Sequence, residues 1–406
     1  MKFRNIIFAL VFSFIVISCD KSENPVEPVS REQGALLSSS YLGTFGASLI
    51  QQLVSAYDPT GFGSVLFTYD VDVYKIVYNT VDTKGQITKA SGAVFIPKGK
   101  NNLSIASVQH GTQTKSTNVA SVNPLNGAEG LIGAALGYYV VMPDYLGLGE
   151  SVMIHPYHHQ KTSAATVIDI IRAGRAYASS KSISLNGQVF LLGYSEGGYV
   201  TLAAQKEIEK NYSSEFKLTA SAPMAGAFDL NLTAQKIIAQ SNYDQPSYLA
   251  FFMVAYNQIY GWNNLTDIFN EPYAGRMNSL FDGTKSTNEI NAQLASNLTQ
   301  LFKRSFIDSY SNGTFKLLID AFNENSLLNF KPVTPTKLFH GNADEFVPYE
   351  NSVKAKDYFV SQGADVELVT INGGGHVSSA VPSVIAAIQW FESLRLKKQY
   401  KYAGNW

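Results

Sequence analysis

The sequence predicts an α/β fold in which a mostly parallel sheet is flanked by helices, and three observations support this prediction. Short apolar runs alternate with stretches of helical spacing across residues 103–225 and again across 336–394, which is the pattern of βαβ units. Residues 65–97 alternate between apolar and polar positions, as an antiparallel hairpin does. Residues 188–209 have the pattern of a strand, a tight turn and a helix around a Gly-x-Ser-x-Gly motif.

Length and composition restrict the classes of function. The chain has 406 residues, of which 45% are hydrophobic, and its formal net charge is −1. This is enough apolar material for one large domain with an insertion. The near-zero charge gives no electrostatic basis for binding nucleic acid, so no nucleic acid partner is expected. Nothing in the sequence indicates the oligomeric state.

The first 18 residues have the pattern of an export signal. Lys2 and Arg4 precede an apolar stretch at 6–17, which is too short to span a bilayer as a helix. The following Ser18-Cys19 resembles the lipobox of bacterial lipoproteins, and this implies cleavage before Cys19 and lipid attachment to it, at the envelope of a bacterial cell. An ordinary secretory signal with an incidental cysteine is the alternative. Residues 19–35 are polar and aperiodic, so we expect a tether.

The remaining elements follow in order. Residues 36–57 have helical character, and the hairpin at 65–97 is expected at an edge of the sheet. The repeat breaks at 228–330, where only helical segments are indicated, so we expect a core of 36–227 and 331–406 with a helical cap insertion between them. The aromatic residues of the cap either line a pocket or form its own core. Further strands are expected at 103–108, 138–142, 188–192, 218–225, 336–341 and 365–371, and helices at 163–178 and 381–394.

The Gly-x-Ser-x-Gly motif predicts a nucleophile elbow at Ser195. An apolar strand leads into Gly193, and a helical pattern begins after Gly197. These two glycines lack side chains where the strand and the helix crowd the turn. Ser195 is therefore expected in a strained conformation with its hydroxyl exposed.

A serine hydroxyl becomes nucleophilic only when a base removes its proton and an acid holds that base. Asp344 follows one late strand, and His376 follows the next in a glycine-rich loop. Since the carboxyl ends of parallel strands meet at one edge, we expect Ser195, Asp344 and His376 to converge there. Glu345 is the competitor for the role of the acid.

Four further histidines are considered for structural or metal-binding roles. His340 lies at the end of a strand, and His155, His158 and His159 form a cluster that suggests a metal site. No cysteine or carboxylate accompanies that cluster at ligand spacing, so neither a metal nor another cofactor is expected. Asp144, at an earlier strand end, is expected to be a structural or pocket residue.

The tetrahedral intermediate of acyl transfer also needs hydrogen-bond donors for its oxyanion. One expected donor is the backbone N–H of Glu196, directly after the nucleophile. The other is expected in the loop after the strand at 103–108, where Gly111 permits close approach and the Thr112 N–H is the first choice. A plain tight turn explains this loop equally well when it is considered in isolation.

Together these motifs resemble the α/β-hydrolase superfamily over about residues 65–395. The sequence GYSEGG around Ser195, the run PDYLGLG after residue 142 and the His155-Pro-Tyr157 that follows resemble the secretory lipase and related carboxylesterase group. This resemblance implies a serine hydrolase that cleaves small-molecule or lipid carboxylic esters through an acyl-enzyme, without a cofactor. A serine peptidase of prolyl-oligopeptidase type and an inactive hydrolase-fold binding protein are the alternatives.

Overall fold

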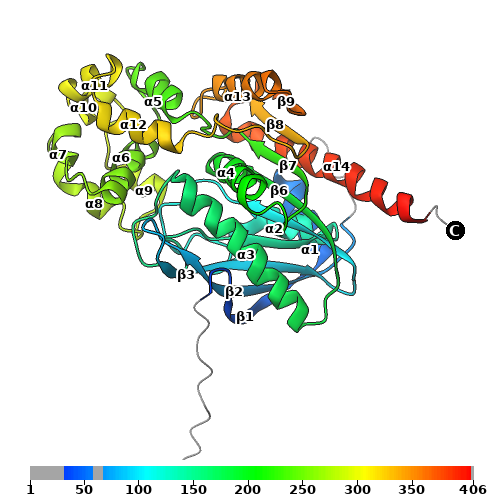
Figure 1. Cartoon of the computed structure of the whole chain (residues 1–406). Helices are drawn as coiled ribbons and strands as arrows, with labels where there is room; N and C mark the ends of the chain where they lie inside the picture. Colours follow the sequence, from blue (N-terminus) through cyan, green and yellow to red (C-terminus); the bar gives the residue numbers. More distant parts are fainter. Residues whose placement is uncertain (1–31, 58–66, 404–406) are drawn as a thin grey trace, which may run out of the picture. The chain divides into compact units, whose positions relative to one another are not determined.

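A twisted sheet runs through the part of the chain that this computed structural model describes, residues 32–57 and 67–403 (Figure 1). Its nine strands are β1 (Leu36–Phe45), β2 (Val71–Val81), β3 (Ile87–Pro97), β4 (Leu103–Gln109), β5 (Tyr139–Pro143), β6 (Leu185–Tyr194), β7 (Leu218–Met224), β8 (Thr336–Gly341) and β9 (Val366–Ile371). They lie in the order β1-β2-β3-β5-β4-β6-β7-β8-β9. The pairs from β1 to β5 are antiparallel, and the pairs from β5 to β9 are parallel.

Helices cover both faces of the sheet because successive side chains of a strand point to opposite sides. On β5, Tyr139 and Val141 belong to one apolar cluster, and Val140 and Met142 belong to the other. The first cluster includes α3 (Gln160–Ser180), α4 (Glu196–Asn211) and α13 (Glu350–Ser361). The second includes α1 (Ala47–Tyr57), α2 (Ala128–Ala135) and α14 (His376–Ala403). The predicted α/β class with a mostly parallel, two-sided sheet is therefore confirmed.

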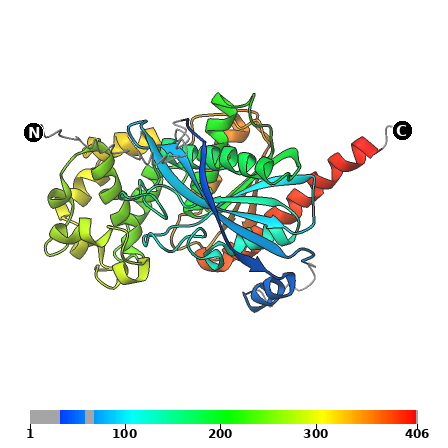
Figure 2. The ribbon, with the colours of Figure 1, turned by 90° about the horizontal axis from the view of Figure 1, so that it is seen from below.

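The chain between β7 and β8, all of which is described, contains no strand but two isolated β-bridges, a short 3-10 turn at Ala274–Arg276 and eight α-helices. The α-helices are α5 (Leu230–Ile238), α6 (Pro246–Tyr260), α7 (Leu265–Ile268), α8 (Met277–Leu280), α9 (Thr287–Asn291), α10 (Leu298–Leu301), α11 (Arg304–Ser311) and α12 (Lys316–Asn325). Figures 1 and 2 both show these helices gathered at one end of the sheet. Many of their aromatic side chains pack against one another, as Phe252 and Tyr256 do edge-to-face against Phe322. We call residues 228–330 the cap.

The expectation for residues 36–57 is wrong in its first half. This segment begins with strand β1, and only then does α1 follow. Ser38, Ser39 and Ser40 are weak helix formers, and the open edge of β2 satisfies their backbone groups through antiparallel pairing. Because β1 occupies the edge of the sheet, the β2–β3 hairpin lies one strand further in than predicted.

The last helix also differs from its prediction. α14 begins at His376 rather than at residue 381, so the imidazole belongs to the first residue of a helix rather than to a loop. Within residues 32–57 and 67–403, no helix combines the length and hydrophobicity needed to cross a bilayer. The predicted signal, Cys19 and most of the tether lie outside the described residues.

Candidate active site

Ser195 occupies the sharp turn between β6 and α4. Its backbone has φ 61° and ψ −122°, a conformation that non-glycine residues rarely adopt. Its N–H donates to the Met224 carbonyl at 2.9 Å, which ties the turn to the neighbouring strand. A Cβ on Gly193 would lie 2.4 Å from the carbonyl oxygen of Gly197, and a Cβ on Gly197 would lie 2.0 Å from that of Gln109. The turn therefore requires glycine at both positions.

A continuous chain of hydrogen bonds links Ser195 to His376 and Asp344. The Nε2 atom of His376 lies 2.9 Å from the Ser195 hydroxyl oxygen, and its Nδ1 atom lies 2.6 Å from Oδ2 of Asp344. Glu345 does not contact the ring, since its carboxylate accepts the backbone N–H of His376 at 2.9 Å and thereby caps α14. The geometry thus brings together the three predicted residues and gives Glu345 a different place.

The side chain of Asp344 is buried, and both of its carboxylate oxygens accept hydrogen bonds. Its Oδ1 atom accepts the N–H groups of Phe346 and Val347 at 2.9 and 2.8 Å, and His340 Nε2 donates to Oδ2 at 3.1 Å. Burial by itself raises the pKa of Asp344, but the hydrogen bonds from His340 and His376 outweigh burial and hold that pKa well below its usual value. His340, predicted as structural, therefore contacts the acid directly.

The loop after β4 lies against the elbow. A Cβ on Gly111 would be 3.7 Å from the Ser195 Cβ, an ordinary van der Waals distance, so this loop lies directly beside Ser195. The next residue, Thr112, shares a hydrogen bond of 2.9 Å with the Tyr157 hydroxyl. On the other side, Glu196 is the first residue of α4, where backbone N–H groups have no partner within the helix. The predicted donor segments thus both adjoin Ser195.

The histidine cluster before α3 is divided among separate contacts. His155 bonds to Glu196, and His159 Nδ1 lies 3.0 Å from the Thr162 hydroxyl. His158 is buried among aromatic rings, and burial lowers its pKa to about 3. Across the described ranges, no three His, Cys, Asp or Glu side chains are grouped to hold a metal ion.

Asp144 has a structural place next to the site. It is fully buried directly after β5, and its carboxylate accepts the hydroxyls of Ser91 on β3 and Ser121 in the loop before α2 at 2.6 and 2.5 Å. Burial raises its pKa above the ordinary value. Asp144 therefore fastens the strand end and two neighbouring segments rather than facing Ser195.

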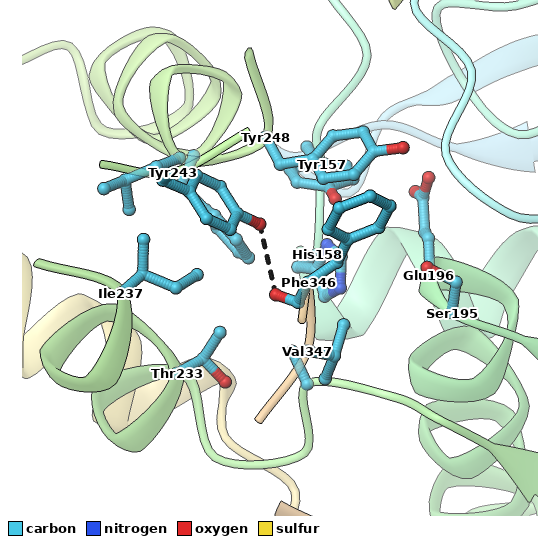
Figure 3. Close-up of a pocket in the computed structure, with 13 residues that line it drawn as sticks. Tyr157, His158, Ser195, Glu196, Thr233, Ile237, Tyr243, Tyr248, Phe346 and Val347 are labelled. Atoms are coloured by element: carbon cyan, nitrogen blue, oxygen red, sulfur yellow. Dashed lines mark hydrogen bonds between the residues drawn. The ribbon is translucent and has the colours of Figure 1, made fainter. Parts of the chain in front are cut away.

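A small cavity adjoins Ser195 between the core and the cap (Figure 3). Its volume of about 20 Å³ corresponds to roughly one water molecule. The hydroxyl of Tyr243 donates to the Phe346 carbonyl at 3.1 Å and joins the cap to the loop that carries Asp344. The residues of the cap that line this cavity are Thr233, Ile237, Tyr243, Tyr248, Leu249 and Phe252.

Several contacts of this site have no clear sequence signal. The Glu196–His155 bond, the Glu345 cap and the Tyr243 hydroxyl each join residues that are more than 30 positions apart. The glutamate directly after Ser195 is visible in the sequence, but nothing near it in the chain indicates His155 as its partner. His340 was predictable from its placement four residues before Asp344 at the end of a strand.

The fold and the three-residue constellation define an α/β-hydrolase. The profile of the secretory lipase family matches residues 131–401, and the chain belongs to that family. Lipase 10 and Lipase 6 of Candida albicans are 23% and 26% identical over 269 and 270 residues, which is 63% of this chain and 55% of each relative. The chain thus matches about half the length of these curated relatives.

Solved structures extend the comparison over most of the chain. The rice cell wall degrading esterase LipA from Xanthomonas oryzae superposes with a TM-score of 0.78 at 28% identity, covering 89% of this chain and 96% of that one. A structure from Legionella pneumophila gives a TM-score of 0.83 at 26% identity, covering 88% and 98%. Candida antarctica lipase A, at 12% identity and a TM-score of 0.66, shares the fold, with coverage of 89% and 82%.

Proposed function

We propose that the chain hydrolyses carboxylic esters through an acyl-enzyme intermediate on Ser195. The observation that carries this proposal is the pair of hydrogen bonds on either side of His376, 2.9 Å to Ser195 and 2.6 Å to Asp344. The strained backbone of Ser195, which presents the hydroxyl at the tip of the turn, supports the same role. Membership of the secretory lipase family agrees with an ester as the substrate.

In the first step, the Ser195 oxygen attacks the ester carbonyl while His376 Nε2 takes the hydroxyl proton. Ionised Asp344 accepts the Nδ1–H of the ring, so that Nε2 is free to act as the base. The backbone N–H groups of Glu196 and Thr112 stabilise the oxyanion, with Gly111 leaving room for the substrate. His376 then gives its proton to the departing alcohol, and Ser195 carries the acyl group.

In the second step, His376 Nε2 takes a proton from water as the water oxygen attacks the acyl carbonyl. The same donors stabilise the second oxyanion. When this intermediate collapses, the proton on His376 returns to the Ser195 oxygen and the carboxylic acid leaves. Both steps use only groups of the chain, the ester and water, and neither step changes an oxidation state.

We further propose short acyl groups as the preferred substrates. The cavity beside Ser195 is bordered by Ile237, Leu249 and Phe252, which favours an apolar acyl chain. Its volume of about 20 Å³ accommodates roughly one small group beyond the carbonyl unless the cap shifts.

A panel of p-nitrophenyl esters from acetyl to palmitoyl tests both parts of the proposal. We expect the highest kcat/KM with acetyl or propionyl esters and no turnover in Ser195→Ala, with a dipeptidyl p-nitroanilide remaining uncleaved. Turnover that persists in Ser195→Ala would exclude the mechanism. Cleavage of the anilide in preference to the esters would favour the peptidase alternative instead, and a preference for palmitoyl would contradict only the proposed chain length.

Export and lipid attachment at Cys19 form a separate part of the proposal. The support is the charged and apolar start of the sequence and the Ser18-Cys19 pair. We expect Cys19→Ala to move the protein from the membrane fraction to the soluble fraction of an exporting bacterial host. Unchanged membrane association of Cys19→Ala would contradict attachment through this residue.

A further inference from the structure

A buried pair of one histidine and one glutamate lies directly behind the oxyanion side of the site. The Nε2 atom of His155 is 2.6 Å from Oε1 of Glu196, and the two side chains are 5% and 0% exposed. The Nδ1 atom of the same ring is 2.7 Å from the carbonyl oxygen of Leu146. His155 thus joins the loop after β5 to the residue that follows the nucleophile.

The protons of this pair can be counted from its partners. A carbonyl oxygen only accepts, so the Nδ1 atom of His155 must carry a proton toward Leu146. One further proton lies between Nε2 and Glu196. Burial alone would raise the pKa of Glu196, but the charge and hydrogen bond of His155 lower it below its usual value. The pair therefore shares one proton across a 2.6 Å contact and carries no net charge.

The position of Glu196 makes this neutrality important. Its backbone N–H is one of the two expected donors to the oxyanion. The Glu196 carboxylate therefore belongs to the same residue that binds the developing negative charge of the substrate. Its second oxygen, Oε2, is buried and has no hydrogen-bond partner among the described residues. Without the proton that it shares with His155, an ionised Glu196 would repel the oxyanion in a medium of low dielectric. Figure 3 shows the Glu196 side chain starting beside Ser195 at the beginning of α4, with its carboxylate at the end away from Ser195.

We propose that His155 is a positioning residue, which neutralises Glu196 and fixes the first turn of α4 so that its N–H meets the oxyanion. This inference rests on the proposed ester hydrolysis. It assigns a role in turnover to His155, for which the sequence analysis predicted no role beyond membership of a histidine cluster without a metal. It also explains how a glutamate is tolerated directly after the nucleophile.

Four variants test the proposal by steady-state kinetics on p-nitrophenyl acetate. In His155→Asn the amide still reaches Leu146 but not Glu196, and we expect kcat to fall by about 10- to 100-fold with little change in KM. In His155→Gln the amide still donates to Glu196, so the fall is smaller. We expect kcat to fall less in Glu196→Gln than in His155→Asn. Adding Glu196→Gln to His155→Asn removes the uncompensated charge and should raise kcat about tenfold over His155→Asn alone.

The double variant separates this role from simple tethering. If the pair only holds the loop in place, loss of either partner breaks the same contact, and the double variant will be no faster than His155→Asn. That result, or a kcat unchanged in His155→Asn, would overturn the proposal. Thermal unfolding of each variant confirms that the compared proteins are folded. If the wild type hydrolyses the ester and Ser195→Ala does not, the proposed function stands whatever the His155 and Glu196 variants show. A wild type without esterase activity would contradict the proposed function itself.

Discussion

The strained turn at Ser195 predicts that the protein is more stable with glycine at the nucleophile than with alanine. Ser195 has φ 61° and ψ −122°, a region that glycine enters freely and that other residues occupy at a cost. Both Ser195→Gly and Ser195→Ala lose the hydroxyl and its 2.9 Å contact with His376. Their difference therefore reports the backbone strain and not the lost hydrogen bond.

The size of the difference follows from two opposing terms. A residue in such a conformation carries about 1–3 kcal/mol of strain. Glycine gives back about 0.4–1 kcal/mol because it gains more freedom in the unfolded chain. We therefore expect Ser195→Gly to be more stable than Ser195→Ala by about 1 kcal/mol, which corresponds to a rise of roughly 1–2 °C in Tm for a domain of this size.

The measurement is thermal or urea unfolding of the two variants side by side, with ester hydrolysis recorded for both. Neither variant should turn over p-nitrophenyl acetate, because neither has a nucleophile. Equal stability, or a more stable alanine variant, would refute the reasoning that the turn stores strain at Ser195. In that case the positive φ would be relaxed by its surroundings, and the elbow would owe its shape to the glycines alone.

Three further predictions follow from the same site. Asp344→Asn should lower kcat by about 10³- to 10⁴-fold, whereas Glu345→Gln, which keeps an oxygen that can accept the His376 N–H, should lower it less than tenfold. The pKa of Asp344 is lowered in the folded protein, so its ionised form stabilises the fold at pH values above the unfolded-chain pKa of about 3.9, and this stabilisation is lost as pH falls below that value. The difference in unfolding free energy between wild type and Asp344→Asn should therefore shrink between about pH 5 and pH 2. A difference that stays constant over this range would contradict the prediction. Gly197→Ala places a Cβ 2.0 Å from the Gln109 carbonyl oxygen and should abolish activity and soluble expression, while Gly275→Ala, with no atom within 4 Å of the new Cβ, should behave as wild type in the same expression and activity measurements.

Much of the site could be predicted because its residues stand at the ends of parallel strands. Ser195, Asp344 and His376 each follow an apolar run, and strands in a parallel sheet bring their carboxyl ends to one edge. The spacing of apolar residues therefore predicts their convergence without knowledge of any contact. Glycines beside Ser195 add a steric requirement that is also visible in the linear sequence.

Other features depended on partners that are distant in the chain. Residues 36–45 became a strand because the edge of β2 was open to pairing, and their own pattern did not indicate this. The choice of Asp344 over Glu345 was made by geometry, since one carboxylate reaches the ring of His376 and the other its backbone N–H.

The sequence by itself determined the class of fold and predicted the nucleophile and the order of its partners, because periodicity and turn chemistry are local properties of the chain. Only the tertiary structure decided what surrounds them: the pairing of His155 with Glu196, the contact of His340 with Asp344, and the small cavity that the cap lines in part. Those features arise from side chains that meet across loops. Their meeting depends on how the elements pack and not on the residues next to them in the sequence.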